Sequence, residues 1–181
     1  NYQMEDLYRN CLWKNFGAAI DMLKNVIVLY PDERWKKDTK FFYMAYHTII
    51  FLDYYLSQPV KNFTPALSYT IVDSSAMPLN AIDDVIPDRL YDKEDFVAYL
   101  SIIQKKCREL ITKTSKNKFS ERWIEDAEIN LHGLCPDMVI NYTLLEILFY
   151  NLRHVQHHVG QLNFILRQKK DIAADWISLV D

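Results

Sequence analysis

Hydrophobic residues recur at helical spacing along four long stretches of this chain. In the first, residues 4 to 30, they stand three or four positions apart, which predicts an amphipathic helix that Pro31 ends. The second stretch, residues 34 to 56, is hydrophobic on most of its circumference after Phe41. A helix that is hydrophobic nearly all round belongs in the middle of a bundle or at a subunit contact.

The third stretch predicts a helix over residues 92 to 114. Asp92 is a suitable N-cap, and the two carboxylates of the first turn then face the positive end of the helix dipole. Residues 115 to 136 are polar and irregular, with a short helical turn expected around Trp123. The pattern thus predicts a helix that ends in a long surface connection.

The fourth stretch predicts the last helix. It is expected to start at Pro136-Asp137 and to run to about Gln168, with no Gly or Pro before its histidines. A short tail follows Asp171. We expect this tail, which contains Trp176 and Ile177, to fold back on the helices.

Residues 58 to 91 differ from the rest of the chain. Four prolines interrupt them, and no periodicity persists. A connection this long inside a compact domain usually covers or lines a site, so we expect it to act as a lid. It is also long enough to cross from one end of a bundle to the other, which would let the helices that it joins run parallel.

Composition supports a helical fold. The chain has 181 residues, half of them hydrophobic, but only three glycines and six prolines. A β-rich protein of this size would need many more turn residues. We therefore predict an all-α protein, a four-helix bundle that forms a single domain over residues 1 to 181.

Charge and cysteine content exclude several classes of partner. A net charge of −3 and a pI near 6.0 argue against a nucleic-acid-binding surface. The hydrophobic runs are far shorter than the roughly 20 residues that span a bilayer, so no membrane segment is expected. The three cysteines are widely spaced and form no CxxC motif, which is typical of a reducing compartment and predicts a cytoplasmic protein.

The inward face of the last helix changes from aliphatic to polar half-way along. Burying an unpaired polar group costs roughly 1–3 kcal/mol, so several in a row need a partner. A bound metal with a water and hydrogen-bonded neighbours would satisfy them, and so would a closed polar network without metal. The stripe consists of Ile140, Leu144, Ile147, Asn151, His154, His158, Gln161 and Ile165.

Two histidines of this stripe have the spacing of a metal-binding pair. His154 and His158 are four residues apart, so their side chains lie one turn apart on one face of a helix. His47 occupies a similar stripe on the second helix, between Met44 and Phe51. Three neutral imidazoles from two helices would suit zinc or a similar ion and would leave a position for water or substrate.

The other two histidines are set aside. His157 lies about 100° around the helix from His158, so the two cannot easily share a metal. His132 stands beside Gly133 in the irregular segment and is expected to be a surface residue. Better-known signatures are absent from the sequence, which contains neither HExxH nor Glu-x-x-His and has no Cys near a His at zinc-finger spacing.

The run His154-Val-Gln-His-His158-Val-Gly-Gln161-Leu resembles the His-x-x-x-His-x-Gly-Gln signature of DinB-like (YfiT-like) proteins. The resemblance implies an up-down-down-up four-helix bundle whose metal is held by three histidines. The first ligand of this family lies on the second helix, in a context like Met44-Ala-Tyr-His47-Thr here. The resemblance spans the whole chain, although its specific part is about a dozen residues.

By this resemblance His47, His154 and His158 would be the ligands of a divalent metal, which could be zinc, nickel or iron. Some members of the family are thiol S-transferases or isomerases that use a low-molecular-weight thiol, and homodimers are common among them. The metal lowers the pKa of the thiol and so produces the thiolate nucleophile. Where the family often has Arg before the glycine, this chain has Val159, so the role of that Arg with anionic ligands is not expected here.

These observations favour a metal-dependent enzyme that activates a thiol or a water for a small-molecule substrate. Candidates for orienting the ligands or that molecule are Gln161, Asn151, Tyr43 and Tyr54. A non-catalytic module, stabilised by metal, is the alternative, because no general base stands near the histidines in the sequence. A haem-binding bundle is a third hypothesis, which the i, i+4 pair disfavours because haem needs one histidine from each side. The apolar surfaces of the first two helices predict a homodimer.

Overall fold

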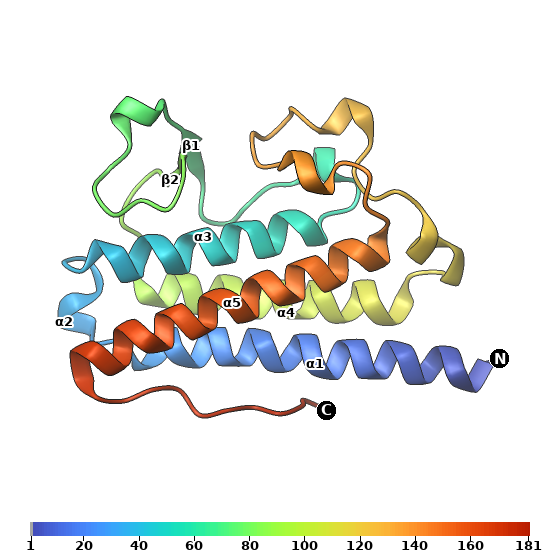
Figure 1. Ribbon diagram of the computed structural model, residues 1–181, viewed down its shortest axis with the longest axis horizontal. Coiled ribbons are helices and arrows are strands. Elements are labelled where there is room, and N and C mark those ends of the chain that lie inside the picture. Colours follow the sequence, from blue (N-terminus) through green and yellow to red (C-terminus); the bar gives the residue numbers. More distant parts are fainter. Residues whose placement is uncertain (1) are drawn as a thin grey trace.

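The computed structural model describes residues 2–181, and α-helices make up most of them. Figure 1 shows four long helices lying side by side. Helix α1 packs against α4 and α5, and α3 packs against the same two helices on the other side. The chain is therefore all-α, as the hydrophobic periodicity predicts. The long helices are α1 (Tyr2–Leu29), α3 (Thr39–Leu56), α4 (Lys93–Lys113) and α5 (Leu144–Lys170).

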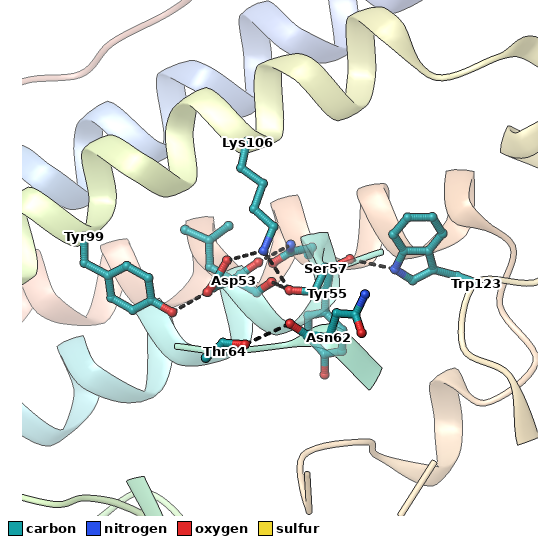
Figure 2. A network of polar contacts seen from close by, with 10 residues as sticks. Asp53, Tyr55, Ser57, Asn62, Thr64, Tyr99, Lys106 and Trp123 are labelled. Carbon is teal, nitrogen blue, oxygen red and sulfur yellow. Dashed lines mark hydrogen bonds and ion pairs between the residues drawn. The ribbon is translucent and has the colours of Figure 1, made fainter. Parts of the chain in front are cut away.

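Helix α3 is buried on nearly every face within the single chain, which agrees with the first of its two predicted places, inside the helical bundle, and not with the second, a subunit contact. The connecting segments cover the faces that α4 and α5 leave open. The Tyr46 hydroxyl donates to the carbonyl of Leu67 at 2.6 Å. Nε1 of Trp123 donates to the carbonyl of Tyr55 at 2.8 Å, as Figure 2 shows. The aromatic surface of α3 is thus buried within the chain.

The second helix begins later than predicted. Residues 34 to 38 do not continue α3, because a separate short helix, α2 (Asp32–Trp35), and a turn precede it. Trp35 explains the break: its ring is buried against Phe42 and Phe96, and its Nε1 donates to the carbonyl of Tyr91 at 2.9 Å. The short helix α2 and the turn after it thus place the Trp35 side chain in the core.

The last helix also begins later than predicted, at Leu144 instead of Pro136-Asp137. Residues Asp137–Val139 form a 3₁₀ turn (η5), and a capping box starts α5. Thr143 Oγ1 accepts from the backbone N–H of Glu146, whose carboxylate accepts from the N–H of Thr143 at 2.8 Å. This reciprocal pair is a stronger start signal than an upstream proline.

Residues 58 to 91 contain more regular structure than their sequence predicts. Strands β1 (Tyr69–Ile71) and β2 (Val85–Pro87) pair antiparallel, with Thr70 opposite Ile86. Three-residue strands are too short for an alternating pattern to reveal them. The 3₁₀ helices η1 (Val60–Asn62) and η2 (Ser74–Ala76) complete this segment.

The sequence predicts a short helical turn around Trp123 in the segment between α4 and α5, but the helical turns of this segment lie on either side of that residue. They are η3 (Lys116–Ser120) and η4 (Asp126–Glu128). The indole of Trp123 is buried, so this polar segment contributes a side chain to the hydrophobic core. Helix α4 itself has the predicted bounds within one residue, and Asp92 caps it through a capping box with Asp95.

The C-terminal tail folds back along α1, as expected, although not through Trp176, which is 73% exposed. The N–H of Val180 donates to the carbonyl of Lys14 at 3.1 Å, and Nε1 of Trp13 donates to the carbonyl of Asp181 at 3.0 Å. A Cβ on Gly17 would lie 2.4 Å from the Val180 side chain. The absence of a side chain at Gly17 therefore allows the tail to lie against α1.

A buried ion pair joins α3 to α4 (Figure 2). The Asp53 carboxylate accepts from Nζ of Lys106 at 2.7 Å and from the hydroxyl of Tyr99, and Lys106 also donates to Ser57 Oγ at 2.7 Å. Burial, with the neighbouring carboxylate second, raises the pKa of Tyr99, so the phenol stays a donor. We call these four residues the Asp53 network.

Within residues 2–181, none of the helices combines the length and the hydrophobicity that crossing a bilayer requires.

Candidate metal centre

Helices α3 and α5 bring three histidines together. His47 lies on α3, whereas His154 and His158 lie one turn apart on α5, and their potential ligand atoms all lie within 4.8 Å of one another. The Nε2 atom of His154 is 3.0 Å from Nε2 of His47 and 3.0 Å from Nε2 of His158. We call this group the histidine cluster.

His47 is oriented by a carboxylate from the segment between α3 and α4. Its Nδ1 is 2.8 Å from Oδ2 of Asp83. A carboxylate only accepts hydrogen bonds, so Nδ1 carries the proton and Nε2 keeps its lone pair. That lone pair points into the cluster. A ligating histidine in a metal site usually has such a partner on its other nitrogen.

His158 is oriented in the same way by Gln161. Its Nδ1 is 2.7 Å from Oε1 of Gln161, one turn further along α5. An amide oxygen is also an acceptor, so Nδ1 of His158 carries the proton and its Nε2 presents a lone pair. Both outer histidines thus direct acceptor atoms at His154.

His154 cannot donate a hydrogen bond to both of these lone pairs and also find partners for both of its own nitrogen atoms. A neutral imidazole has one N–H, which it could direct at His47 or His158 but not fully at both. In the described part of the chain, its buried Nδ1 has no hydrogen-bond partner. A cation at the point where the three Nε2 atoms meet would satisfy all of these lone pairs, so the donor set suits a metal such as zinc, nickel or iron.

Burial keeps the two histidines of α5 neutral. Burial, with the neighbouring imidazoles second, lowers the pKa of His154 to about 3 and that of His158 to about 4. Neutral imidazole is the form that binds metal ions. At neutral pH no proton has to leave these rings before an ion can bind.

Aromatic side chains surround the cluster. The Phe51 ring lies 4.8 Å from the ring of His47, centroid to centroid, and the Tyr150 ring is stacked nearly parallel to His154 at 6.4 Å. These rings place aromatic surface beside His47 and His154. Low polarity strengthens electrostatic interactions with a bound ion.

Of the four candidate orienting residues, the structure brings Gln161 to a ligand. Asn151 is buried one turn before His154, and its Nδ2 donates to the carbonyl of Leu52 at 3.1 Å, so it joins α5 to α3 beside the site. Gln161 is exposed, contrary to its predicted place in a buried stripe, although its amide still reaches His158. The polar half of the stripe therefore ends at the protein surface.

The two tyrosine candidates lie on α3 on either side of His47. Tyr43 is half-buried one turn before it, and burial raises its pKa. Tyr54 lies about two turns after it, roughly 10 Å along the helix axis. The Tyr54 ring packs against Phe63 and His132. Tyr54 thus belongs to the packing beneath the connecting segments, and Tyr43 is nearer the cluster.

The remaining histidines lie outside the cluster. His157 is exposed, as helical geometry predicts, with its ring 5.0 Å from that of His158. His132 is half-buried, contrary to the surface position expected for it. Its Nε2 donates to the carbonyl of Val60 at 2.9 Å, and its ring packs on Phe63. It holds the connecting segments together.

Asp83 is a hydrogen-bonding partner of the histidine cluster that the sequence did not indicate. It lies in the segment of residues 58 to 91, which was expected to cover the site, and an Asp83-Asp84 pair stands there among few other charges. A carboxylate in a covering segment is a weak signal, because nothing local says which of the two would face a histidine.

Comparisons of the chain with protein-family models, with curated proteins and with solved structures found no match. Its function is therefore inferred from the residues and their geometry.

Proposed function

We propose that this chain is a DinB-like metal-binding protein whose divalent ion, zinc, nickel or iron, is held by His47, His154 and His158. One observation carries the proposal: three Nε2 atoms converge within contact distance, and two of the three rings are turned by acceptors on their other nitrogen. Groups that only accept do not cluster without a cation or donors between them.

The arrangement of the helices supports the family proposal. In Figure 1, α1 runs from the N label toward α2. Helices α3 and α4 both run in the opposite direction to α1, and α5 runs in the same direction as α1. This course of the chain supports an up-down-down-up order, in which the segment of residues 57 to 92 would connect α3 and α4 as a parallel pair. We propose a single domain over residues 1 to 181 with this topology.

We propose further that the protein is an enzyme. A metal ion held by three neutral imidazoles keeps positions open and would lower the pKa of a bound thiol or water toward neutrality. A low-molecular-weight thiol or a water would then react with a small-molecule substrate, as in a thiol S-transferase or a hydrolase. Asp83 and Gln161 would hold the ligand rings in place during that reaction.

A non-catalytic module stabilised by metal is the second candidate, and one observation favours it. Asp83 is the carboxylate that contacts the cluster, and both of its oxygens are engaged, one by His47 and one by the N–H of Val85 at 3.0 Å. A carboxylate held in this way is a poor general base. Haem is disfavoured, because a macrocycle cannot fit between His47 and His154 rings that are already in contact.

Metal analysis tests the proposed site directly. Protein purified without a nickel column is expected to contain about one equivalent of zinc, nickel or iron by mass spectrometry, and the apo-protein should melt at a higher temperature after one of these ions is added. His158→Ala should lose the ion. His157→Ala is the matched control, because it removes an exposed neighbouring ring and should leave the metal content unchanged.

Absence of metal from the wild type, with no change in melting temperature on adding zinc, nickel or iron, would refute the site. Metal retained at full content by His158→Ala would refute the ligand set. Enzyme and module are then separated by a thiol-transfer assay on a panel of electrophiles with the metal-loaded protein. Turnover that His154→Ala abolishes supports the enzyme, and no turnover with any thiol or with water supports the module.

We also propose a homodimer in the cytoplasm. Hydrophobic side chains remain exposed on α1 and α5 around an open hollow of about 1230 Å³, among them Tyr8 and Phe149. The cysteines are free, with Cys11 exposed and Cys107 buried. Sedimentation analysis is expected to give twice the mass of the chain, and Phe149→Asp should give the monomer. A monomeric wild type would refute the dimer.

A further inference from the structure

The loop between β1 and β2, residues 72 to 84, reaches from the hairpin to α3. The hairpin closes at its base, where the N–H of Val72 donates to the carbonyl of Asp84 at 3.0 Å. Two side-chain hydrogen bonds join the loop to α3. Nδ2 of Asn80 donates to Oγ1 of Thr39 at 3.1 Å, and Oδ2 of Asp83 accepts from His47. The loop thus contacts α3 near its start and at the candidate ligand.

Asp83 is held from its own side by the backbone of the hairpin. Its Oδ1 accepts from the N–H of Val85, the first residue of β2, at 3.0 Å. The other oxygen faces Nδ1 of His47, whose side chain is 13% exposed against 28% for Asp83. One carboxylate therefore connects the β2 backbone with the ring that points its Nε2 into the cluster.

The next residue has the same charge but faces solvent. Asp84 is exposed, and its part in the hairpin is made by its backbone carbonyl, which accepts from Val72. Replacing the Asp84 side chain therefore changes the net charge as replacing Asp83 does, without changing the contact with His47. Asp84 is therefore a matched control for Asp83.

We propose that Asp83 is a positioning residue that couples the loop of residues 72 to 84 to metal binding at the histidine cluster. The inference rests on the proposed metal site. With Asp83 in place, His47 is held in the tautomer and orientation that metal binding needs. By reciprocity, an ion on Nε2 of His47 strengthens the Nδ1 hydrogen bond and holds the loop against α3.

The loop is suited to such a response. Leu79, directly before the contact of Asn80 with α3, is 86% exposed, and Ile82, between the two contacts with α3, is 39% exposed. Three residue pairs form the hairpin at its base. A segment with few buried contacts opens at low free-energy cost, so one additional hydrogen bond changes how often it is open.

The affinity for Zn²⁺ alone, measured by competition with a chromophoric chelator, tests the first half of the proposal. Asp83→Ala is expected to weaken binding about 10–100-fold, the range typical of the loss of a partner behind a ligand. Asp84→Ala should bind as the wild type does. Asp83→Asn should recover part of the loss, because its amide oxygen can still accept from His47 although it lacks the charge.

Hydrogen–deuterium exchange tests the coupling to the loop. Adding Zn²⁺ to the wild type and to Asp84→Ala should slow exchange in peptides that cover residues 72 to 85. In Asp83→Ala at saturating Zn²⁺ this protection should be absent, while peptides of α5 around His154 and His158 are still protected. A residue that only stabilised the fold would change exchange equally with and without metal.

The outcomes separate this inference from the proposed function. A wild type that binds no Zn²⁺ refutes the metal site and the coupling together. A wild type that binds Zn²⁺, with Asp83→Ala matching Asp84→Ala in affinity and loop protection, refutes the coupling alone. If Asp83→Ala does not fold, the comparison is made with Asp83→Asn, which keeps the shape of the side chain, and equal behaviour of Asp83→Asn and Asp84→Asn refutes the coupling.

Discussion

Helix α3 contributes to two polar clusters that are built in opposite ways. Toward α4, the Asp53 network pairs a carboxylate with an ammonium group and two hydroxyls, so donors and acceptors match (Figure 2). Toward α5, the histidine cluster brings together three groups of one kind, whose inward lone pairs outnumber the available protons. The first network is satisfied by its own residues, whereas the lone pairs of the second need a cation or additional donors.

The difference separates polar groups that the fold itself satisfies from polar groups that it does not. A buried polar group that has its partner within the fold needs nothing further. In the histidine cluster, Asp83 and Gln161 turn two lone pairs inward instead of pairing them, and Nδ1 of His154 lacks a partner among residues 2–181. A costly arrangement of buried polar groups is often found where a ligand binds and satisfies them.

The largest effect is expected from removing the central ring of the histidine cluster. His154→Leu should lose zinc binding entirely, because Nε2 of His154 lies 3.0 Å from both other ligand atoms. In EDTA, however, its free energy of unfolding should stay within about 1 kcal/mol of the wild type, since an apolar side chain replaces an unsatisfied polar one. Calorimetric titration and urea unfolding measure the two effects. A loss of several kcal/mol in EDTA would mean that the cluster is a closed structural network.

The second effect is a pH dependence that belongs to the histidine cluster. The folded-state pKa values of His154 and His158, about 3 and about 4, lie below the ordinary value near 6.5, so the unfolded chain binds more protons at intermediate pH. In EDTA the free energy of unfolding should therefore fall as the pH drops from about 6.5 toward 4. The slope is up to about 1.4 kcal/mol per pH unit for each histidine.

Urea unfolding of the apo-protein between pH 7.5 and 4.5 measures this slope. The double variant His154→Leu/His158→Leu serves as the control and should show a shallower decline. If the two curves fell in parallel, the acid sensitivity would belong to other groups.

A third, smaller effect is expected in the Asp53 network. Lys106→Met should destabilise the fold by about 3 kcal/mol, because it leaves the buried Asp53 carboxylate with the Tyr99 hydroxyl as its remaining partner in the network. This lies at the lower end of the range for broken buried pairs, since the Lys106 side chain is 35% exposed. Lys105→Met is the control, because Lys105 is exposed and should change stability little. Metal binding should be unchanged in both variants, and a loss of zinc from Lys106→Met would show that the two clusters are coupled.

The smallest effect concerns the exposed edge of the histidine cluster. Gln161→Leu should weaken zinc binding about tenfold, the lower limit for such a partner, because water can reach Nδ1 of His158 in its place. Gln168→Leu, an exposed change on the same helix, is the comparison. An effect on affinity as large as that of Asp83→Ala would indicate that Gln161 is part of the binding pocket.

Helices were predictable to the extent that local signals are strong. The bounds of α4 follow from its periodicity and from Asp92. The starts of α3 and α5 were predicted too early, because the burial of Trp35 and the reciprocal cap of Thr143 with Glu146 compete with periodicity at those points. The hairpin of β1 and β2 was missed, since strands of three residues have too few positions to show a pattern.

The candidate site likewise has a part that local sequence signals predict and a part that they do not. Helical spacing by itself determined that His154 and His158 share a face and that His157 does not, because the i, i+4 relation is a property of any α-helix. The packing of α3 on α5 decided that His47 lies beside them, and the hairpin decided that Asp83 lies behind His47. Contacts between residues distant along the chain depend on how whole elements pack, and no local pattern encodes the register of that packing.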